Sequence, residues 1–147
     1  METLPLEIGE TAHALRKAFD RRASALGVTR AQWKVLFHLS RTPGLRQVEL
    51  ADLLDIEPIT LCRIVDRLEE SELVERSQDP DDRRARKLHV TARAQPLIEK
   101  LQALAAELAN EAFAGIDPAD VNATRAALAR VRENVGRGPA NRASDNE

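Results

Sequence analysis

Apolar residues recur every three or four positions in the first part of the chain. Between Leu6 and Leu26 they share one face of a helix, while Arg16, Lys17 and other basic residues fall between them. The apolar positions are Ile8, Ala12, Leu15, Phe19 and Leu26. Gly27 follows directly and is expected to end this helix, because glycine favours the position after a helix C-terminus.

A second helix is predicted after Thr29, whose hydroxyl can bind the first free backbone amides of a helix. Trp33, Leu36 and Phe37 fall on one face of this helix. The Thr-Pro-Gly sequence at positions 42–44 ends it, because proline and glycine both disfavour helix continuation.

Two further helices, joined by a tight turn, are predicted in the middle of the chain. The first is short, Arg46–Leu54, and the second begins at Pro58 and ends near Glu70. Proline suits the first helical turn, where its missing N–H would have no partner within the helix. The outward face of the second helix carries Ile59, Thr60, Arg63, Asp66 and Arg67. This order of elements predicts a helix-turn-helix.

The helical pattern stops after Leu73. Val74–Arg76 and Leu88–Val90 are expected to form two short strands, and the Asp-Pro-Asp-Asp sequence at 79–82 supplies the turn between them. The only strongly basic cluster of the chain follows this turn and consists of Arg83, Arg84, Arg86, Lys87 and Arg93. The sequence therefore predicts a basic β-hairpin.

Two long helices are predicted in the last third of the chain. One runs from Thr91 to about Ala114, and the other begins at Pro118 and ends near Asn134. Each helix has a single apolar face, which needs a partner to cover it. Residues 137–147 lack apolar periodicity and are expected to be a disordered tail.

Composition limits the possible functions. The net charge is −2, from 22 basic and 24 acidic residues, so nucleic-acid binding has to come from local clusters of charge. A single cysteine, Cys62, excludes an intramolecular disulfide framework. No apolar run reaches the ~18 residues that span a bilayer, and the N-terminus does not resemble a signal peptide, so a cytoplasmic location without a membrane partner is expected.

The sequence shows no pattern typical of a catalytic or metal-binding site. The three histidines fall on different predicted elements, so no metal site is expected. The sequence contains no phosphate-binding loop, no dinucleotide fingerprint and no nucleophile with a base and an orienting acid. These observations predict a protein that is not an enzyme and has no cofactor.

Two stretches of the sequence resemble the multiple antibiotic resistance regulator (MarR) family. The first is Gln47–Leu61, continued by Asp66–Glu69, which is similar to the family's helix-turn-helix. The second is Asp79–Ala85 with Leu88–Thr91, which is similar to the wing of the family, where an Asp-Arg-Arg tip returns to a Leu-x-Leu-Thr strand end. The similarity covers about residues 6–134.

The resemblance implies a mainly α fold with a small β-hairpin wing: a winged helix-turn-helix flanked by N- and C-terminal dimerisation helices. It implies one domain over residues 1–136, with a DNA-binding lobe at about 42–91 and dimerisation helices at about 6–26 and 92–135. The sequence departs from the family at Glu72, where a glycine commonly ends the recognition helix. The turn after that helix is therefore expected to differ in shape.

The implied function is that of a sequence-specific transcriptional regulator. A homodimer would place two recognition helices about one helical turn apart on a near-palindromic double-stranded operator. Arginine can form two hydrogen bonds with guanine in the major groove, which makes Arg63 the first candidate for reading a base. The other candidates on this helix are Ile59, Thr60 and Arg67.

The wing is expected to lie along the minor groove, where narrow A·T-rich tracts attract arginine. Arg84 is the candidate for insertion into the groove, and the resemblance implies that Asp82 orients Arg84 and braces the loop. The expected phosphate contacts are Arg83, Arg86 and Lys87.

The resemblance also implies a small aromatic or phenolic effector in a crevice beside the dimerisation helices, and hence a ligand-responsive repressor. Arg16, Trp33, Phe37 and His38 are candidates to border this crevice, although Trp33 and Phe37 also suit an ordinary core. Two alternatives remain open. One is a winged-helix adaptor that binds proteins instead of DNA, and the other is a redox-sensing regulator that uses Cys62.

Overall fold

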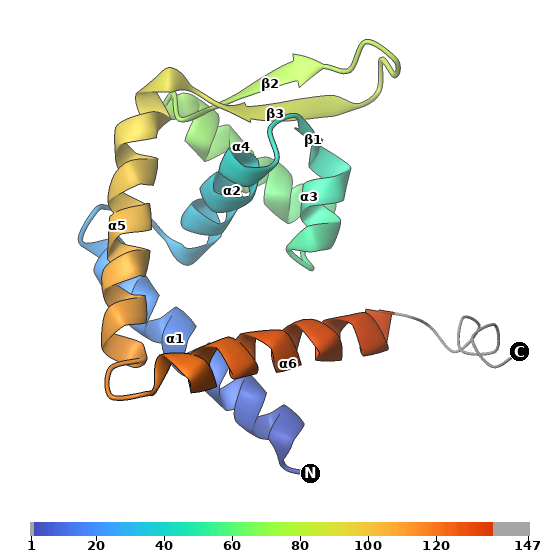
Figure 1. Cartoon of the computed structure of the whole chain (residues 1–147). Coiled ribbons are helices and arrows are strands. Elements are labelled where there is room, and N and C mark those ends of the chain that lie inside the picture. The colour runs from blue at the N-terminus through green and yellow to red at the C-terminus, as the bar shows by residue number, and fades with distance from the viewer. Residues whose placement is uncertain (1, 137–147) are drawn as a thin grey trace, which may run out of the picture. The chain divides into compact units, whose positions relative to one another are not determined.

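The computed structural model describes residues 2–136, and the predicted tail at 137–147 lies outside the described residues. The chain divides into two compact units, Met1–Leu108 and Ala109–Glu147. The α-helices are α1 Leu4–Ser24, α2 Arg30–Arg41, α3 Gln47–Leu53, α4 Pro58–Glu70, α5 Gln95–Ala112 and α6 Pro118–Gly136 (Figure 1). The strands are β1 Leu45–Arg46, β2 Val74–Gln78 and β3 Arg86–Val90. This is the mainly helical fold with a small wing that the sequence predicted.

Helix starts follow the predicted signals. The Thr29 hydroxyl accepts a hydrogen bond from the Gln32 amide at 3.2 Å, and the Gln32 side chain accepts one from the Thr29 amide at 3.1 Å. This reciprocal pair fixes the start of α2. Pro58 occupies the first turn of α4, and Asp117 binds the Ala119 amide at 2.8 Å at the start of α6.

Three helices of the first unit end in the same way. A residue one or two positions after the C-cap adopts a left-handed conformation: Gly27 (φ 74°), Asp55 (φ 52°) and Glu72 (φ 60°). The amide of the next residue then bonds to the carbonyl five residues back, as in Leu73 to Leu68 at 2.9 Å. This pattern satisfies carbonyls that have no partner within the helix and turns the chain sharply into the next element.

The strands form an antiparallel sheet in the order β1-β3-β2. In β2 and β3, Val74 pairs with Val90 and Arg76 pairs with Leu88. The short β1 strand adds Leu45 opposite Leu88 and Arg46 opposite Lys87. Figure 1 shows β2 and β3 continuing beyond α3 and α4 as a projecting hairpin.

Two predicted boundaries were wrong. Arg46 was expected to start a helix, but it lies in β1, because its extended backbone (φ −68°, ψ 145°) pairs with Lys87. The helix predicted from Thr91 begins instead as a 3-10 turn at Ala92–Ala94, and α5 starts at Gln95. The Thr91 hydroxyl binds the Ala94 amide there, and Pro96 falls in the first turn of α5, where it needs no amide partner.

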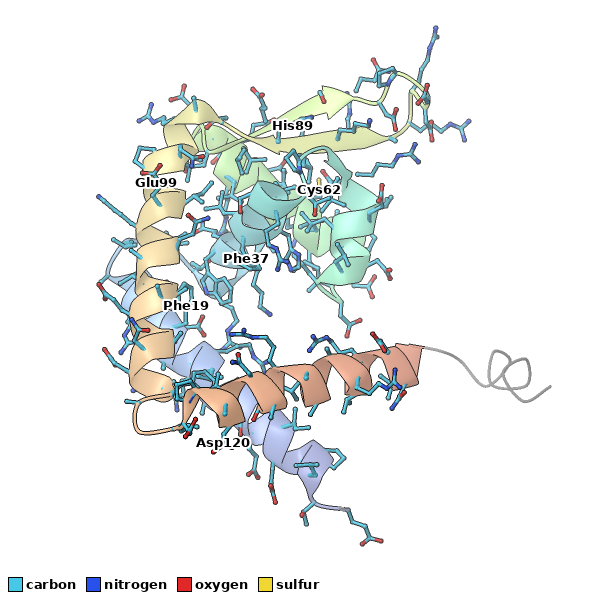
Figure 2. All side chains as sticks on the ribbon, in the orientation of Figure 1. Phe19, Phe37, Cys62, His89, Glu99 and Asp120 are labelled. Carbon is cyan, nitrogen blue, oxygen red and sulfur yellow. The ribbon has the colours of Figure 1, made fainter. Side chains whose placement is uncertain are left out.

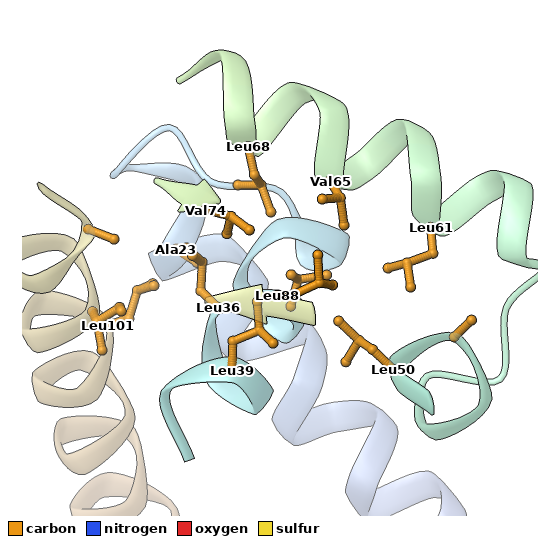
Figure 3. Close-up of a cluster of buried hydrophobic side chains, with 14 residues drawn as sticks. Ala23, Leu36, Leu39, Leu50, Leu61, Val65, Leu68, Val74, Leu88 and Leu101 are labelled. Carbon is orange, nitrogen blue, oxygen red and sulfur yellow. The ribbon is translucent and has the colours of Figure 1, made fainter. Parts of the chain in front are cut away.

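The core of the first unit lies between the helix-turn-helix and the sheet. Leu36, Leu39, Leu50, Leu61, Val65, Leu68, Val74 and Leu88 are almost completely buried in it (Figure 3). Ala23, Ile98 and Leu101 extend the cluster to α1 and α5. These contacts fix which face of α4 turns outward. Among the described residues no helix is long and apolar enough to cross a membrane.

Candidate nucleic-acid interface

The outward face of α4 is mainly polar and lies away from the core. Burial of Leu61, Val65 and Leu68 on the opposite side holds the helix in a single rotational position. Thr60, Arg63 and Arg67 are consequently exposed, and Ile59 is 63% exposed. The four residues predicted to read DNA therefore share an accessible helix face, and their contacts with bases remain a prediction.

Acidic side chains on α4 are held by Arg76 of β2. The guanidinium Nη1 lies 2.7 Å from Asp66 Oδ1 and 3.1 Å from Glu69 Oε1. Nε donates to Gln47 Oε1 at 3.0 Å, and Nη2 donates to the Cys62 carbonyl at 3.1 Å. Arg76 thus joins β2 to α3 and α4, and it balances the charge of two carboxylates on α4.

Burial by itself lowers the pKa of Arg76. The hydrogen bond and charge of Asp66, together with those of Glu69, outweigh burial and leave the pKa above its usual value. Arg76 therefore stays charged, and Cys62 lies half-buried beside it with Sγ 3.7 Å from Nη2.

The loop between β2 and β3 is organised by Asp79, whose side chain is only 1% exposed. Its Oδ1 accepts a hydrogen bond from the Asp81 amide at 2.9 Å. Its Oδ2 receives Arg46 Nε at 2.8 Å and Arg46 Nη2 at 2.7 Å. The bond from the Asp81 amide, with the charges of Arg46 and Lys87, holds the pKa of Asp79 below its usual value even though burial raises it.

Most basic side chains of the wing are exposed to solvent. Arg83, Arg84 and Arg86 are exposed and Lys87 is half-buried, and Figure 2 shows nitrogen-tipped side chains extending from the end of the hairpin. Asp82 Oδ1 accepts a hydrogen bond from the backbone amide of Arg84 at 2.9 Å. Asp82 therefore contacts Arg84 through the main chain, and orientation of the guanidinium by Asp82 remains a prediction.

The candidate effector residues lie on α1 and α2. Figure 2 labels Phe37, which is one of them, and Phe19, which contacts Trp33. Trp33 packs edge-on against Phe19 at 4.7 Å and donates to Asp20 Oδ1 at 2.8 Å. Trp33 thus makes internal contacts, as its alternative assignment to the core predicted.

Phe37 is 44% exposed, and the Arg41 guanidinium lies 5.4 Å from its ring centre. His38 contacts Phe37 edge-on, and Arg16 is half-buried. Burial lowers the pKa of His38, and the charges of Arg41 and Lys34 lower it further. His38 is therefore largely neutral near pH 7.

Sequence reasoning missed the roles of Arg46 and Arg76. Arg76 could have been found from the strand period, because it lies two residues after the buried Val74 and so faces the same side of the sheet. Arg46 carried a weaker signal, since it precedes α3 at a position where Ser, Thr, Asp or Asn is preferred.

A helix-turn-helix with an exposed face, followed by a basic hairpin on the same unit, defines the class of winged-helix DNA-binding proteins. A family model described as the MarR family matches residues 28–85. A solved structure of the transcriptional regulator PA3341 is 36% identical over 90% of this chain and 97% of its own, with a TM-score of 0.80. The chain belongs to the MarR family of DNA-binding transcriptional regulators, which are not enzymes.

Two further structures support the class. MarR from E. coli in its apo form is 26% identical, with 87% of this chain and 95% of its own covered and a TM-score of 0.78. A protein assigned to the same family from Listeria monocytogenes, solved with a 26mer DNA, is 25% identical over 92% of this chain and 90% of its own, with a TM-score of 0.80. The latter complex favours DNA over protein as the partner of the fold.

Proposed function

We propose that the protein is a ligand-responsive repressor that binds a near-palindromic operator as a homodimer in the cytoplasm. One observation carries the proposal: the first unit presents the outward face of α4 and a basic wing, both exposed and both free of internal ion pairs at Arg63 and Arg84 among the described residues. A regulator with this geometry can block transcription by occupying its operator.

Within this proposal α4 enters the major groove and the wing lies along the minor groove. Arg63 reads a guanine, Arg67 supports it from the next turn, and Ile59 and Thr60 contact base edges near the start of the helix. Arg84 enters a narrow minor groove, and Arg83, Arg86 and Lys87 contact phosphates. The basic charge in the wing provides the attraction that a net charge of −2 does not.

A homodimer accounts for apolar side chains left exposed in each unit. In the first unit Leu4 and Leu6 of α1 are 48% and 69% exposed. In the second unit Val131 and Val135 of α6 are 44% and 76% exposed, and none of the described residues of α6 is buried. Such surfaces are rarely left open to water in a monomer, and a second copy with two-fold symmetry can cover them.

A small aromatic or phenolic effector is proposed to bind near Phe37, His38 and Arg16. The exposed ring of Phe37 with the Arg41 cation beside it suits an aromatic acid, since the ring can stack and the cation can pair with a carboxylate or phenolate. Binding would change the separation of the two recognition helices and so weaken the operator complex. Allosteric coupling of this kind needs only about 1–3 kcal/mol.

The operator complex tests the proposal. The full-length protein is used to select duplexes from a random library, and binding to the selected duplex is then followed by fluorescence anisotropy. Arg63→Ala and Arg84→Ala are each expected to weaken binding about ten-fold, as loss of one specific contact does. Lys100→Ala on α5 serves as the control and should bind like the wild type. Unchanged binding by both arginine variants would refute the assigned contacts.

A further inference from the structure

Each of the four polar atoms of Asp79 forms a hydrogen bond within the protein. Its amide donates to the Ala85 carbonyl at 3.2 Å, and its carbonyl accepts from the Asp82 amide at 3.3 Å. Its Oδ1 binds the Asp81 amide, and its Oδ2 binds Arg46. Three of these four contacts close the loop on itself, and the fourth connects the loop to the rest of the unit.

Arg46 breaks the usual rule for the residue in front of a helix. This position precedes α3, and its side chain makes no hydrogen bond to the free amides of that helix. Serine, threonine, aspartate or asparagine would stabilise α3 by about 1 kcal/mol here. The Arg46 side chain instead turns to Asp79, which is 33 residues further along the chain. A broken local rule with a long-range partner indicates a role outside the helix itself.

Asp79 also provides a negative charge beside a pair of basic residues in the sheet. Arg46 in β1 lies opposite Lys87 in β3, and like charges on directly paired residues repel. Asp79 lies close enough to both cations for each to lower its pKa. The buried carboxylate thus offsets part of the repulsion between the two basic residues.

These contacts join the start of the helix-turn-helix to the loop between β2 and β3. We propose that the ion pair between Arg46 and Asp79 positions the wing relative to α3 and α4, so that both residues are positioning residues for DNA binding. The inference rests on the proposed use of the wing in the operator complex. Neither side chain needs to touch DNA for this role.

Loss of either partner has a defined consequence. Without Arg46 the Asp79 carboxylate is buried beside only one backbone donor, and a buried charge that loses its partner is strongly destabilising. The loop at 79–85 would then leave its closed conformation, and the wing arginines would spend less time in their binding positions. The face of α4 would not change, because its core contacts do not involve either residue.

A double-mutant cycle tests the pair, with the duplex selected by the wild-type protein as the probe. Arg46→Met and Asp79→Asn are each expected to weaken binding about ten-fold, and the double variant should bind no more weakly than either single variant. Asp79→Asn should also combine less than additively with Arg84→Ala in the wing, but additively with Arg63→Ala in α4.

The matched control is Glu49→Gln. Glu49 is a second acid near Arg46, with Oε1 3.8 Å from Nε, but it lies in α3 and is half exposed. Its loss should not weaken binding. Arg46→Lys keeps the positive charge and should retain more affinity than Arg46→Met, and it provides a folded variant if the methionine variant unfolds.

Amide hydrogen exchange of the free protein separates positioning from general stability. In Arg46→Met, the increase in exchange rate should be much larger at residues 79–85 than in α4, beyond the uniform increase that a lower global stability produces. Uniformly faster exchange would reduce the pair to a structural role and overturn the inference.

Three binding results separate the possible failures. Asp79→Asn binding like the wild type while Arg46→Met is weaker would make Arg46 a direct phosphate contact and would overturn the inference. Independent, additive losses from the two variants would overturn it as well. If Arg84→Ala binds DNA as tightly as the wild type, only the proposed groove contact of Arg84 is refuted. The coupling between Arg46 and Asp79 would still show whether the position of the wing affects binding.

Discussion

At the residue scale, Glu72 stands where a left-handed backbone conformation is required. Its φ of 60° is uncommon for a side chain with a Cβ, and the helix end nonetheless forms around it. The Thr91 hydroxyl donates to the Glu72 carbonyl at 2.6 Å, and Arg93 pairs with its carboxylate. These contacts stabilise Glu72 at a position where the family commonly has glycine. The helix end keeps its hydrogen bonds.

Glu72→Gly is expected to raise the free energy of unfolding by about 1 kcal/mol, because glycine adopts positive φ without steric cost. The lost ion pair with Arg93 contributes little, since both side chains are about 70% exposed. Urea unfolding followed by circular dichroism measures the change. Gly27→Ala is the matched comparison and should lower stability by a similar amount, since Gly27 has φ 74°. A Glu72→Gly variant less stable than the wild type would contradict this account.

Asp79 makes stability depend on pH in a defined direction. Its lowered pKa means that the folded state keeps the carboxylate charged more readily than the unfolded chain does. The resulting stabilisation is present at neutral pH and is lost as the pH falls from about 5 through the lowered pKa of the folded state. Asp79→Asn should therefore be less stable than the wild type at pH 7, with a difference that narrows towards pH 3.

The measurement is urea unfolding of both proteins between pH 7 and pH 3. Asp20 and His38 also have lowered pKa values, so acid destabilises the wild type through them too. Their contributions occur in both proteins and cancel in the difference. A difference that stays constant over this range would rule out Asp79 as a source of the pH dependence.

At the scale of elements, Arg76 connects α4 to the β2 strand of the wing through ion pairs. It lies in β2, binds Asp66 and Glu69 of α4, and contacts Gln47 at the start of α3. Arg76 connects these elements by ion pairs and hydrogen bonds, whereas the core connects them by apolar contacts. Each of these polar contacts needs a particular distance and direction between its atoms, which apolar packing does not require.

Arg76→Ala is expected to lower the free energy of unfolding by roughly 2 kcal/mol, because two carboxylates and a half-buried carbonyl lose their donor. Chemical unfolding of the variant checks this value. Arg67→Ala on the exposed side of α4 provides the control and should change stability by less than about 0.5 kcal/mol. Equal effects of the two variants would show that Arg76 acts as an ordinary surface residue.

At the scale of the whole molecule, the exposed apolar residues of α1 and α6 predict self-association. Sedimentation equilibrium should give about twice the chain mass of 16.3 kDa. Leu6→Glu combined with Val135→Glu should shift the protein towards the monomer and weaken operator binding, because a monomer contacts only one half-site. Leu53→Glu, at a 58% exposed position of α3, should leave the dimer intact. A wild-type monomer at micromolar concentration would refute the proposed assembly.

Much of the fold follows from local patterns in the sequence. The period of the apolar residues placed the helices, Pro58 and Thr29 marked helix starts, and the Asp-Pro-Asp-Asp turn located the wing. The exposed face of α4 was predictable for the same reason, since the buried residues on one side of a helix fix its other side. These features involve residues close in sequence, and their patterns can be recognised without a structure.

Only the tertiary structure decided which polar residues act inside the fold. Asp79 is one of four turn residues in the sequence pattern and Arg46 is the predicted start of a helix, but packing brings these residues, 33 positions apart in the chain, together in one ion pair. Arg76 was predicted only as a strand residue until the packing of β2 against α4 brought Asp66 and Glu69 to it. The sequence by itself determined the helices, the wing and the basic cluster, because these depend on local spacing. The ion pair between Arg46 and Asp79 depends on strand register and on burial of a single carboxylate, which arise only when distant segments pack.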